Sequence, residues 1–490
     1  MYVKSDRPEI FGRYEKNIHR FLRLFRKKHV TLQQKSNIVY KMKRKLLLLA
    51  LVCGAAVSAF AGGLMTNTNY HIAFDRMMAR GATFDIDAAY SNPAGLAWGH
   101  NGWQLSLNFQ KPWQRRNIET TLEGQQTSNF YKGVASAPIV PALFASYKKD
   151  RWALSAMLGI VGSGGFCEYE DGVPMFNLVL QGMLSQKGVT PGQYRLDTSM
   201  KGKQYIYGGQ VNFTYRFLDC LSAAVGLRVN YYDGYYRGHV VADKHFLLGD
   251  LATLRVDVDQ TGWGVAPIIG VNYHKGPLTL AARYEFRTKI SAKNSTNTLE
   301  ASLGDGVTNL LKVLAPSSLK TINETLEAKT QPYKDGEKTR YDMPALLVAA
   351  VGYEFTPKLR ATLEYHFFDD KNANMAGGRQ KELQHGTHEF LAGAEYDINK
   401  KWTVSAGIQR TDYGLSDGYQ QNTSFACDSW SVGLGGAWNI TEKMRLNAGY
   451  FITLYSDYTK QCNAQRDGYA GKDVYSRSNN VIGIGLDYRF

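Results

Sequence analysis

Two groupings of polar residues in this sequence could do chemistry. His385 and His388 flank a Gly-Thr pair and could ligate a metal or a haem iron, although no third ligand accompanies them. Glu364 and His366 are two residues apart, so on a strand they share one face and could form an acid–base pair. A charge network inside the protein is the alternative interpretation of the second pair, and we favour it.

Other signatures of catalysis are missing. The sequence has no His-Glu-x-x-His segment and no Cys-x-x-Cys pair, and we expect no nucleophile elbow of the hydrolase type. We therefore predict that the protein is not an enzyme and that it uses no cofactor and no metal. A haem-binding surface receptor remains an alternative, and it would require His385 and His388.

The elements that position these residues are strands. Apolar and polar side chains alternate strictly in residues 444–455, and residues 103–110 and 278–287 repeat the pattern. Such alternation is typical of a strand with two different faces. It recurs in fourteen segments, which we predict as strands: 103–112, 138–149, 151–164, 205–217, 220–237, 261–274, 277–290, 344–356, 358–369, 387–399, 401–413, 428–440, 443–458 and 478–490.

The connections between these segments alternate in length. Tight turns such as Lys149-Asp150 and Asn399-Lys400 alternate with connections of fourteen to more than fifty residues. Short periplasmic turns and long external loops are typical of bacterial outer-membrane barrels, which close with an even number of strands. We therefore predict an all-β fold, a 14-stranded antiparallel transmembrane β-barrel over residues 102–490, in the bacterial outer membrane.

The charge distribution argues against a nucleic-acid partner. Of the formal net charge of +15, +11 lies in residues 1–45, where 14 Lys and Arg face 3 Asp and Glu, which leaves +4 for residues 46–490. The mean hydropathy of −0.33 is too polar for a bundle of membrane helices.

The first 61 residues resemble segments that a mature protein lacks. Lys43-Arg44-Lys45, an apolar run and the ending Ala59-Phe60-Ala61 match a secretory signal peptide over 42–61, cleaved before Gly62. A membrane anchor is the alternative, but the apolar run is short for a span. Residues 1–41 are a basic extension that indicates an over-long gene model, and a genuine extension is the alternative.

Residues 62–101 do not alternate. They include Asn92-Pro93-Ala94, in which the ring of Pro93 locks its φ and restricts Asn92, giving a defined bend. A segment of this size, with no partner outside, can fold inside a fourteen-strand lumen. We predict an N-terminal hatch over 62–101 that plugs the barrel.

At this point the sequence resembles the FadL/TodX family of outer-membrane transporters for long-chain fatty acids and other hydrophobic compounds. The motif Asn92-Pro93-Ala94 matches that family's hatch motif, and the strand number, the hatch length and the C-terminal Phe490 agree over residues 62–490. The resemblance implies capture at external loops, transfer to a lumenal pocket, and passive lateral exit near an inward kink in strand three. It carries over no pocket residue. A structural or adhesive barrel is a further alternative.

The phase of the alternation predicts which side chains face the lumen. Arg283 and Arg360 face inward and are candidates to bind an anionic head group. The apolar residues on that face either contact a hydrophobic ligand or pack against the hatch, and the two interpretations are compatible. These candidates are Val140, Phe144, Met157, Val161, Ile268, Leu346, Val348 and Leu391.

Glycines and loop patterns add smaller predictions. Gly159 and Gly162 in the third strand are kink candidates, because glycine in a strand often marks a bend or a bulge. Two external loops look partly helical. Residues 175–184 are mostly apolar, and in residues 298–314 the apolar residues recur near helical spacing. They form either a docking groove for a hydrophobic ligand or a cap on the barrel mouth.

Cysteines and partners complete the predictions. Cys427 and Cys462 lie in consecutive external loops, and we predict a disulfide between them because the cell surface permits one. The expected partners are a hydrophobic small molecule, outer-membrane lipids, and the barrel assembly machinery, which would contact the C-terminal strand ending at Phe490. We expect a monomer.

Overall fold

The structure is a computed structural model that describes residues 70–137, 139–185 and 189–490. The predicted basic extension 1–41, the signal peptide 42–61 and the start of the hatch, 62–69, lie outside these residues. None of the helices in the described part of the chain is both long and apolar enough to cross a membrane.

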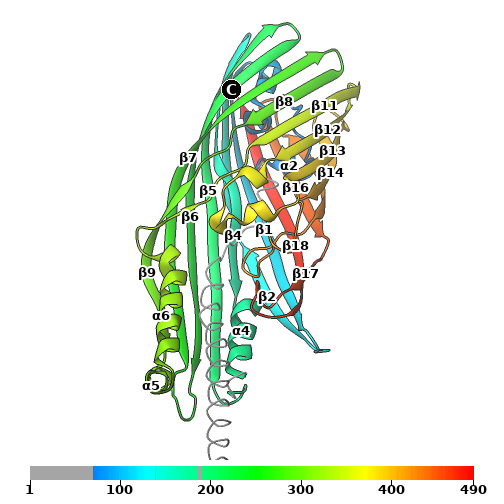
Figure 1. Ribbon diagram of the computed structural model, residues 1–490. Coiled ribbons are helices and arrows are strands. Elements are labelled where there is room, and N and C mark those ends of the chain that lie inside the picture. Colours follow the sequence, from blue (N-terminus) through cyan, green and yellow to red (C-terminus); the bar gives the residue numbers. More distant parts are fainter. Residues whose placement is uncertain (1–69, 138, 186–188) are drawn as a thin grey trace, which may run out of the picture.

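Alternating side chains build a closed antiparallel β-barrel (Figure 1). Within the described residues, 18 strand segments form one sheet, and β1 closes the barrel by pairing with β18. The segments are β1 (Gly102–Leu122), β2 (Ser128–Ser136), β3 (Val140–Lys149), β4 (Trp152–Tyr169), β5 (Arg195–Leu218), β6 (Leu221–Asp243), β7 (Ala252–Lys275), β8 (Leu278–Glu285), β9 (Ser291–Leu303), β10 (Lys338–Arg340), β11 (Leu346–Thr356), β12 (Leu359–Phe368), β13 (Thr387–Asp397), β14 (Trp402–Asp412), β15 (Ser429–Asn439), β16 (Met444–Tyr455), β17 (Tyr458–Cys462) and β18 (Gly471–Arg489).

Four crossings of the barrel wall are interrupted and consist of two segments each. These are β2 with β3, β8 with β9, β10 with β11, and β16 with β17, and both members of each pair contact the same neighbouring crossings. The barrel therefore has fourteen strands, as the sequence predicts.

Helices occupy the hatch and the loops. The hatch contains α2 (Ile72–Arg76), α3 (Ala88–Ser91) and η1 (Pro93–Trp98). The loops contain α4 (Pro174–Ser185), α5 (Asp305–Leu314), α6 (Pro316–Thr330), η2 (Gln331–Tyr333), η3 (Asp370–Asn372) and η4 (Ala376–Glu382). The helix predicted around 175–184 is thus present. The prediction for 298–314 is wrong in its first part, because residues 298–303 belong to β9.

A membrane-facing band surrounds the barrel. Outward side chains of β6 are apolar from Leu221 to Tyr231, and Leu363 of β12 is 65% exposed, which suits lipid and not water. Tyr207, Tyr231 and Trp263 are cross-strand neighbours at the outer edge of the band. Charged pairs begin directly beyond this edge.

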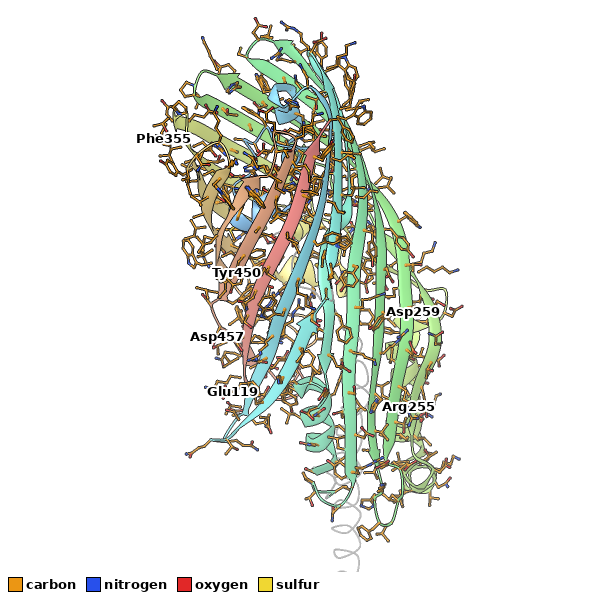
Figure 2. All side chains as sticks on the ribbon, turned by 180° about the vertical axis from the view of Figure 1, so that it is seen from behind. Glu119, Arg255, Asp259, Phe355, Tyr450 and Asp457 are labelled. Atoms are coloured by element: carbon orange, nitrogen blue, oxygen red, sulfur yellow. The ribbon has the colours of Figure 1, made fainter. Side chains whose placement is uncertain are left out.

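The strands β5, β6, β7 and β9 continue beyond that edge on one side of the barrel (Figure 1). On β6 this extension reaches about 40 Å past Tyr231, at ~3.3 Å per residue. Its outward face carries ion pairs such as Lys203–Asp233 at 2.7 Å and Arg237–Asp257 at 2.9 Å. Figure 2 shows Arg255 and Asp259 on the extension, with Phe355 at the opposite end of the molecule.

The extension corrects the predicted strand ends. The sequence predicts β5 to begin at residue 205 and β7 at 261, whereas they begin at Arg195 and Ala252. Outside the membrane both faces of a strand can be polar, so the apolar alternation that marks a membrane strand fades although the hydrogen-bonded ladder continues.

Candidate ligand site in the barrel lumen

The hatch lies inside the barrel and is buried along most of its length. Ile72, Ala88 and Leu96 are each at most 2% exposed. Such burial requires that the polar backbone of this irregular segment find partners on the barrel wall.

The motif Asn92-Pro93-Ala94 anchors the hatch to three strands. The Asn92 side chain accepts a hydrogen bond from the Ala94 N–H at 3.3 Å and donates one to the Val271 carbonyl at 3.1 Å. The hydroxyls of Thr214 and Ser222 donate to the carbonyls of residues 93 and 94, at 2.8 and 2.7 Å. The motif therefore connects the hatch to β5, β6 and β7 near its exit into β1.

Charged side chains make a second anchor. Arg80 pairs with Asp87 at 2.8 Å, and Arg76 of α2 pairs with Glu395 of β13. Arg360 of β12 binds the same glutamate at 2.9 Å. A buried carboxylate shared by several guanidinium groups holds its partners in one geometry, because removing any of them leaves an unpaired buried charge.

These contacts correct the predicted head-group residues. Arg360 is engaged by Glu395 and Asp397, and Arg283 donates to the carbonyl of Tyr90 in the hatch and lies over its ring. Both arginines face inward, as predicted, but they bind the hatch and its supporting wall. We therefore no longer assign either to a ligand.

Glutamate and histidine of β12 also support the hatch. His366 lies between Glu364 at 2.6 Å and Glu389 at 2.9 Å, and Glu364 accepts a hydrogen bond from the Gly81 N–H at 2.7 Å. The structure thus places Glu364 and His366 in a charge network that holds the hatch.

A wall of inward-facing glycines receives helix α2. A Cβ atom on Gly433 would lie 2.4 Å from the Asp75 carbonyl oxygen, and one on Gly449 would lie 2.9 Å from the Asp75 Cβ. Only a residue without a side chain permits this approach of helix backbone to strand backbone. Further glycines of the wall lie close to α2 or to the two residues after it, mostly to their side chains; these are Gly393, Gly407, Gly435, Gly483 and Gly485.

We expect Gly433→Val to displace α2 from the wall. The new side chain meets backbone atoms, which cannot rotate away, whereas the barrel ladder is unchanged. Single-channel recording in planar bilayers should show a leak that the parent lacks. The control is Gly209→Val on the outward face of β5, where only the end of the Leu158 side chain must yield. A Gly433→Val barrel as tight as the parent would contradict this role of the glycine wall.

Most of the predicted apolar ligand contacts pack inside the protein. Phe144, Met157 and Val161 join a buried cluster with Tyr90 and other hatch residues. Leu391 packs against the apolar side chains of α2 and the residues that follow it. The predicted alternative, packing against the hatch, therefore describes these four residues.

Of the other four candidates, some pack within the barrel wall and some line cavities. Leu346 and Val348 pack against Phe368, and Ile268 is 1% exposed. Leu346 also borders a narrow space of about 30 Å³ beside the hatch. Val140 lines a larger cavity.

This larger cavity has a volume of about 120 Å³ and lies against the first described residue of the hatch. An engineered apolar cavity of ~150 Å³ holds benzene, so this space is close to that of one aromatic ring. Its apolar and aromatic lining includes Tyr70, Val140, Ile160, Phe166, Tyr205, Tyr413, Phe451 and Tyr455, and Gln110, Gln114, Ser136 and Asn479 add uncharged polar groups.

Two arginines face each other across this cavity's wall. Arg116 of β1 and Arg477 of β18 are direct cross-strand partners, and both line the cavity. Within the described residues, no carboxylate forms an ion pair with Arg477, which lies over the Tyr455 ring at 4.7 Å. Like charges directly opposite each other destabilise a strand pair. The cavity therefore has a positive end suited to an anionic group.

Sequence reasoning missed this arginine pair. It predicts the first strand to end at residue 112 and the last to begin at 478, whereas β1 reaches Leu122 and β18 begins at Gly471. The alternation does continue, since residues 112 to 120 keep their phase with Arg116, Ile118 and Thr120 inward. Following that phase past Pro112 would have found the site.

Over the described residues, the wall beside the cavity has a gap in its ladder. β3 pairs with β4 up to Leu143 opposite Leu158, and pairing resumes between Ser136 of β2 and Phe166 of β4. Between these points β4 shifts register twice against β5, between Ile160 and Gly162 and again before Gly165. Such shifts are bulges, which bend a strand.

The gap agrees in position with the predicted kink of strand three. Gly162 lies at the first shift, and Gly159 faces Ala142 across the gap's edge. Val140 and Ile160 border both the cavity and the interrupted region. The interrupted ladder therefore lies where the resemblance to the FadL/TodX family implies a lateral exit.

The predicted disulfide is contradicted. Cys427 and Cys462 are separate buried thiols; Cys427 donates to the Tyr475 carbonyl at 3.5 Å, whereas Cys462 is opposite Gly471 on β18. Four residues of strand separate the two positions, too far for a disulfide. Burial raises the pKa of the Cys427 thiol to about 12, which disfavours the thiolate needed for exchange.

His385, in the loop before β13, and His388, at the start of β13, are held by other groups. The Nδ1 atom of His388 lies 2.7 Å from the Tyr365 hydroxyl, and that of His385 lies 2.7 Å from the Gly386 carbonyl. Within the described residues, no group of three or more His, Cys, Asp or Glu could hold a metal ion. The haem interpretation therefore gains no third ligand.

One Gly-x-Ser-x-Gly segment does occur in the sequence, at residues 414–418. It lies in the loop after β14 and not in the strand–turn–helix that a nucleophile elbow requires. The Ser416 hydroxyl donates to the Glu382 carbonyl at 2.5 Å. The segment is a loop turn.

Comparison with known proteins agrees with this geometry. The family described as outer membrane protein beta-barrel domain matches residues 325–490. A Pseudomonas aeruginosa FadL homologue aligns at a TM-score of 0.60 and 15% identity over 87% of this chain and 100% of its own. The fold is that of the FadL and TodX transporters.

Two further FadL-type structures support the assignment of the fold. The Pseudomonas putida toluene transporter TodX aligns at a TM-score of 0.56 and 14% identity, over 88% of this chain and 100% of its own. The monoaromatic hydrocarbon channel CymD aligns at 0.52 and 13%, over 87% and 99%. No curated protein sequence matches the chain. The predicted resemblance to the FadL/TodX family is confirmed at the level of the fold, and the barrel is one of the outer membrane.

Proposed function

We propose that this protein carries hydrophobic small molecules across the outer membrane by passive diffusion through the lumenal cavity. The observation that carries the proposal is a ring-sized cavity directly beside a gap in the barrel wall. Similar folds belong to a toluene transporter and a monoaromatic hydrocarbon channel. The protein would act by binding and passage and not by covalent chemistry. We expect it to work as a monomer, assembled through its C-terminal strand.

The cavity supports a specific class of cargo. Its volume of about 120 Å³ suits a single aromatic ring, and a long acyl chain would have to extend into the gap. The Arg116–Arg477 pair would bind an anionic group on that cargo, since guanidinium groups form strong charge-assisted hydrogen bonds with carboxylates. A structural or adhesive barrel would need neither a cavity nor a positive group at its end.

The gap offers a direct test. An ideal Cβ on Gly159 lies 3.4 Å from the Cβ of Ala142, close to the separation within a disulfide. We expect a Gly159→Cys, Ala142→Cys double variant to cross-link β3 to β4 under oxidising conditions. Uptake of a radiolabelled alkylbenzoate by cells should then fall to the level of cells without the protein, because the lateral route cannot widen.

Reduction provides the control for this variant. Dithiothreitol should restore uptake, and each single-cysteine variant should transport like the parent under both conditions. Cross-linking is scored by mass spectrometry of the linked peptides. Uptake that continues unchanged through a fully cross-linked gap would rule out the lateral route proposed here.

A further inference from the structure

The lipid-facing wall of the barrel carries an apolar groove that is separate from the lumenal site. It has a volume of about 820 Å³ and crosses the outer faces of β7, β8 and β11 to β15. Small side chains, Ala282, Ala349 and Ala392, form its floor. Of these strands, β8 and β11 to β14 lie at the upper right of Figure 1.

Bulky neighbours raise the sides of the groove. Ala349 is directly opposite Ala282 on one side and Tyr365 on the other, and Ala392 is opposite Leu363. Leu363 and Phe390 are 65% and 57% exposed. The medium around these residues is the membrane, so an acyl chain is the partner that such a channel of small and large apolar residues fits.

The groove ends at a cation. Arg410 faces outward on β14, between its cross-strand partners Phe390 and Trp430, and its guanidinium lies 5.8 Å from the Trp430 ring centroid. Because β14 begins at the short turn before Trp402, its far end at Arg410 lies at the outer leaflet.

The partners of Arg410 within the protein leave its guanidinium partly exposed. Its own contacts are the Ser429 carbonyl at 3.2 Å and Asp428 at 3.5 Å, with both side chains of the ion pair about 30% exposed. Such an exposed pair contributes little. A guanidinium in the interfacial layer, next to a tryptophan, is well suited to a lipid phosphate.

We propose that this groove binds one anionic lipid of the outer leaflet, with an acyl chain along the alanine floor and a phosphate that no cationic group of the lipid neutralises against Arg410. The site is independent of the transport function. It would fix lipid to the wall formed by β8 to β14, on which Glu364 and Glu395 hold the hatch from the inside.

Native mass spectrometry tests the proposal. The full-length protein is purified, delipidated and mixed with phosphatidylglycerol or with phosphatidylcholine of the same chains. We expect the parent to retain one phosphatidylglycerol under collisional activation and to prefer it over phosphatidylcholine. Arg410→Gln should remove that preference, with a roughly tenfold loss of affinity for the anionic lipid, as expected for a charge-assisted hydrogen bond.

Filling the floor tests the acyl-chain part. Ala349→Phe, and the milder Ala349→Leu, should reduce retention of both lipids, whereas Ala156→Leu on the outward face of β4 should not. Heat-modifiable migration on gels confirms that each barrel is folded. Equal retention in the parent and the Ala349 variants, or a phosphatidylglycerol preference that survives Arg410→Gln, would overturn the proposal.

Discussion

Deleting residues 70–90 should convert this protein from a closed barrel into an ion-conducting pore. The deletion removes α2 and two of the arginines that bind Glu395, Arg76 and Arg80, while the strand pairing of the wall stays as it is. Asn92-Pro93-Ala94 stays in place with its contacts to β5, β6 and β7. We expect stable conductance in planar bilayers, at a level that the parent never reaches.

The reason for this large effect is that the hatch packs against the lumenal face of the wall. Phe144, Met157, Val161 and Leu391 contact it and would line open water after the deletion. Barrel stability should fall, because each Å² of apolar surface that the hatch no longer covers costs ~25 cal/mol of stabilisation. Heat-modifiable migration is the control for folding. A folded, hatchless barrel that conducts no better than the parent would show that other elements close the lumen.

Replacing Arg116 and Arg477 should abolish the preference of the cavity for anionic cargo. We expect Arg477→Gln to weaken binding of a 4-alkylbenzoate about 10- to 100-fold, since a hydrogen bond to a charged group contributes roughly 1.5–3 kcal/mol. Binding of the corresponding alkylbenzene, which lacks the carboxylate, should not fall. Arg477→Glu should have the largest effect, because the new carboxylate can pair with Arg116 and exclude the ligand. Isothermal titration calorimetry on the detergent-solubilised protein measures all three.

The stability of these variants separates a binding role from a structural one. Two arginines in direct cross-strand contact repel each other, so Arg477→Gln should leave the thermal midpoint unchanged or raise it. Arg151→Gln, at an exposed periplasmic turn, is the matched control. It should change the affinity for neither the alkylbenzoate nor the alkylbenzene. Unaltered alkylbenzoate affinity in Arg477→Gln would place the anion elsewhere.

The class of the fold could be predicted from short-range chemistry. A membrane strand exposes apolar groups to lipid and presents its other face to the lumen. Its apolar residues therefore recur at every second position of the sequence. The fourteen predicted segments therefore correspond to the fourteen crossings of the wall. The bend at Asn92-Pro93 was also predictable, because the proline ring acts locally on its own and the preceding residue.

Tertiary structure alone decided what fills the lumen. Inward orientation made Arg283 and Arg360 look like ligand contacts, but whether an inward group meets cargo or hatch depends on where the hatch lies. That position follows from close backbone approach at glycines such as Gly433 and Gly449, spread over several strands. No local sequence pattern predicts a surface that glycines of several strands form together.

The same distinction explains the cavity and the cysteines. Arg116 and Arg477 are far apart in sequence and meet because β1 closes the barrel against β18. Cys427 and Cys462, in adjacent loops, are kept apart because each contacts a different point of that strand. Periodicity along the chain determined the strands and their faces. Closure of the barrel, which brings distant strands into register, decided the site.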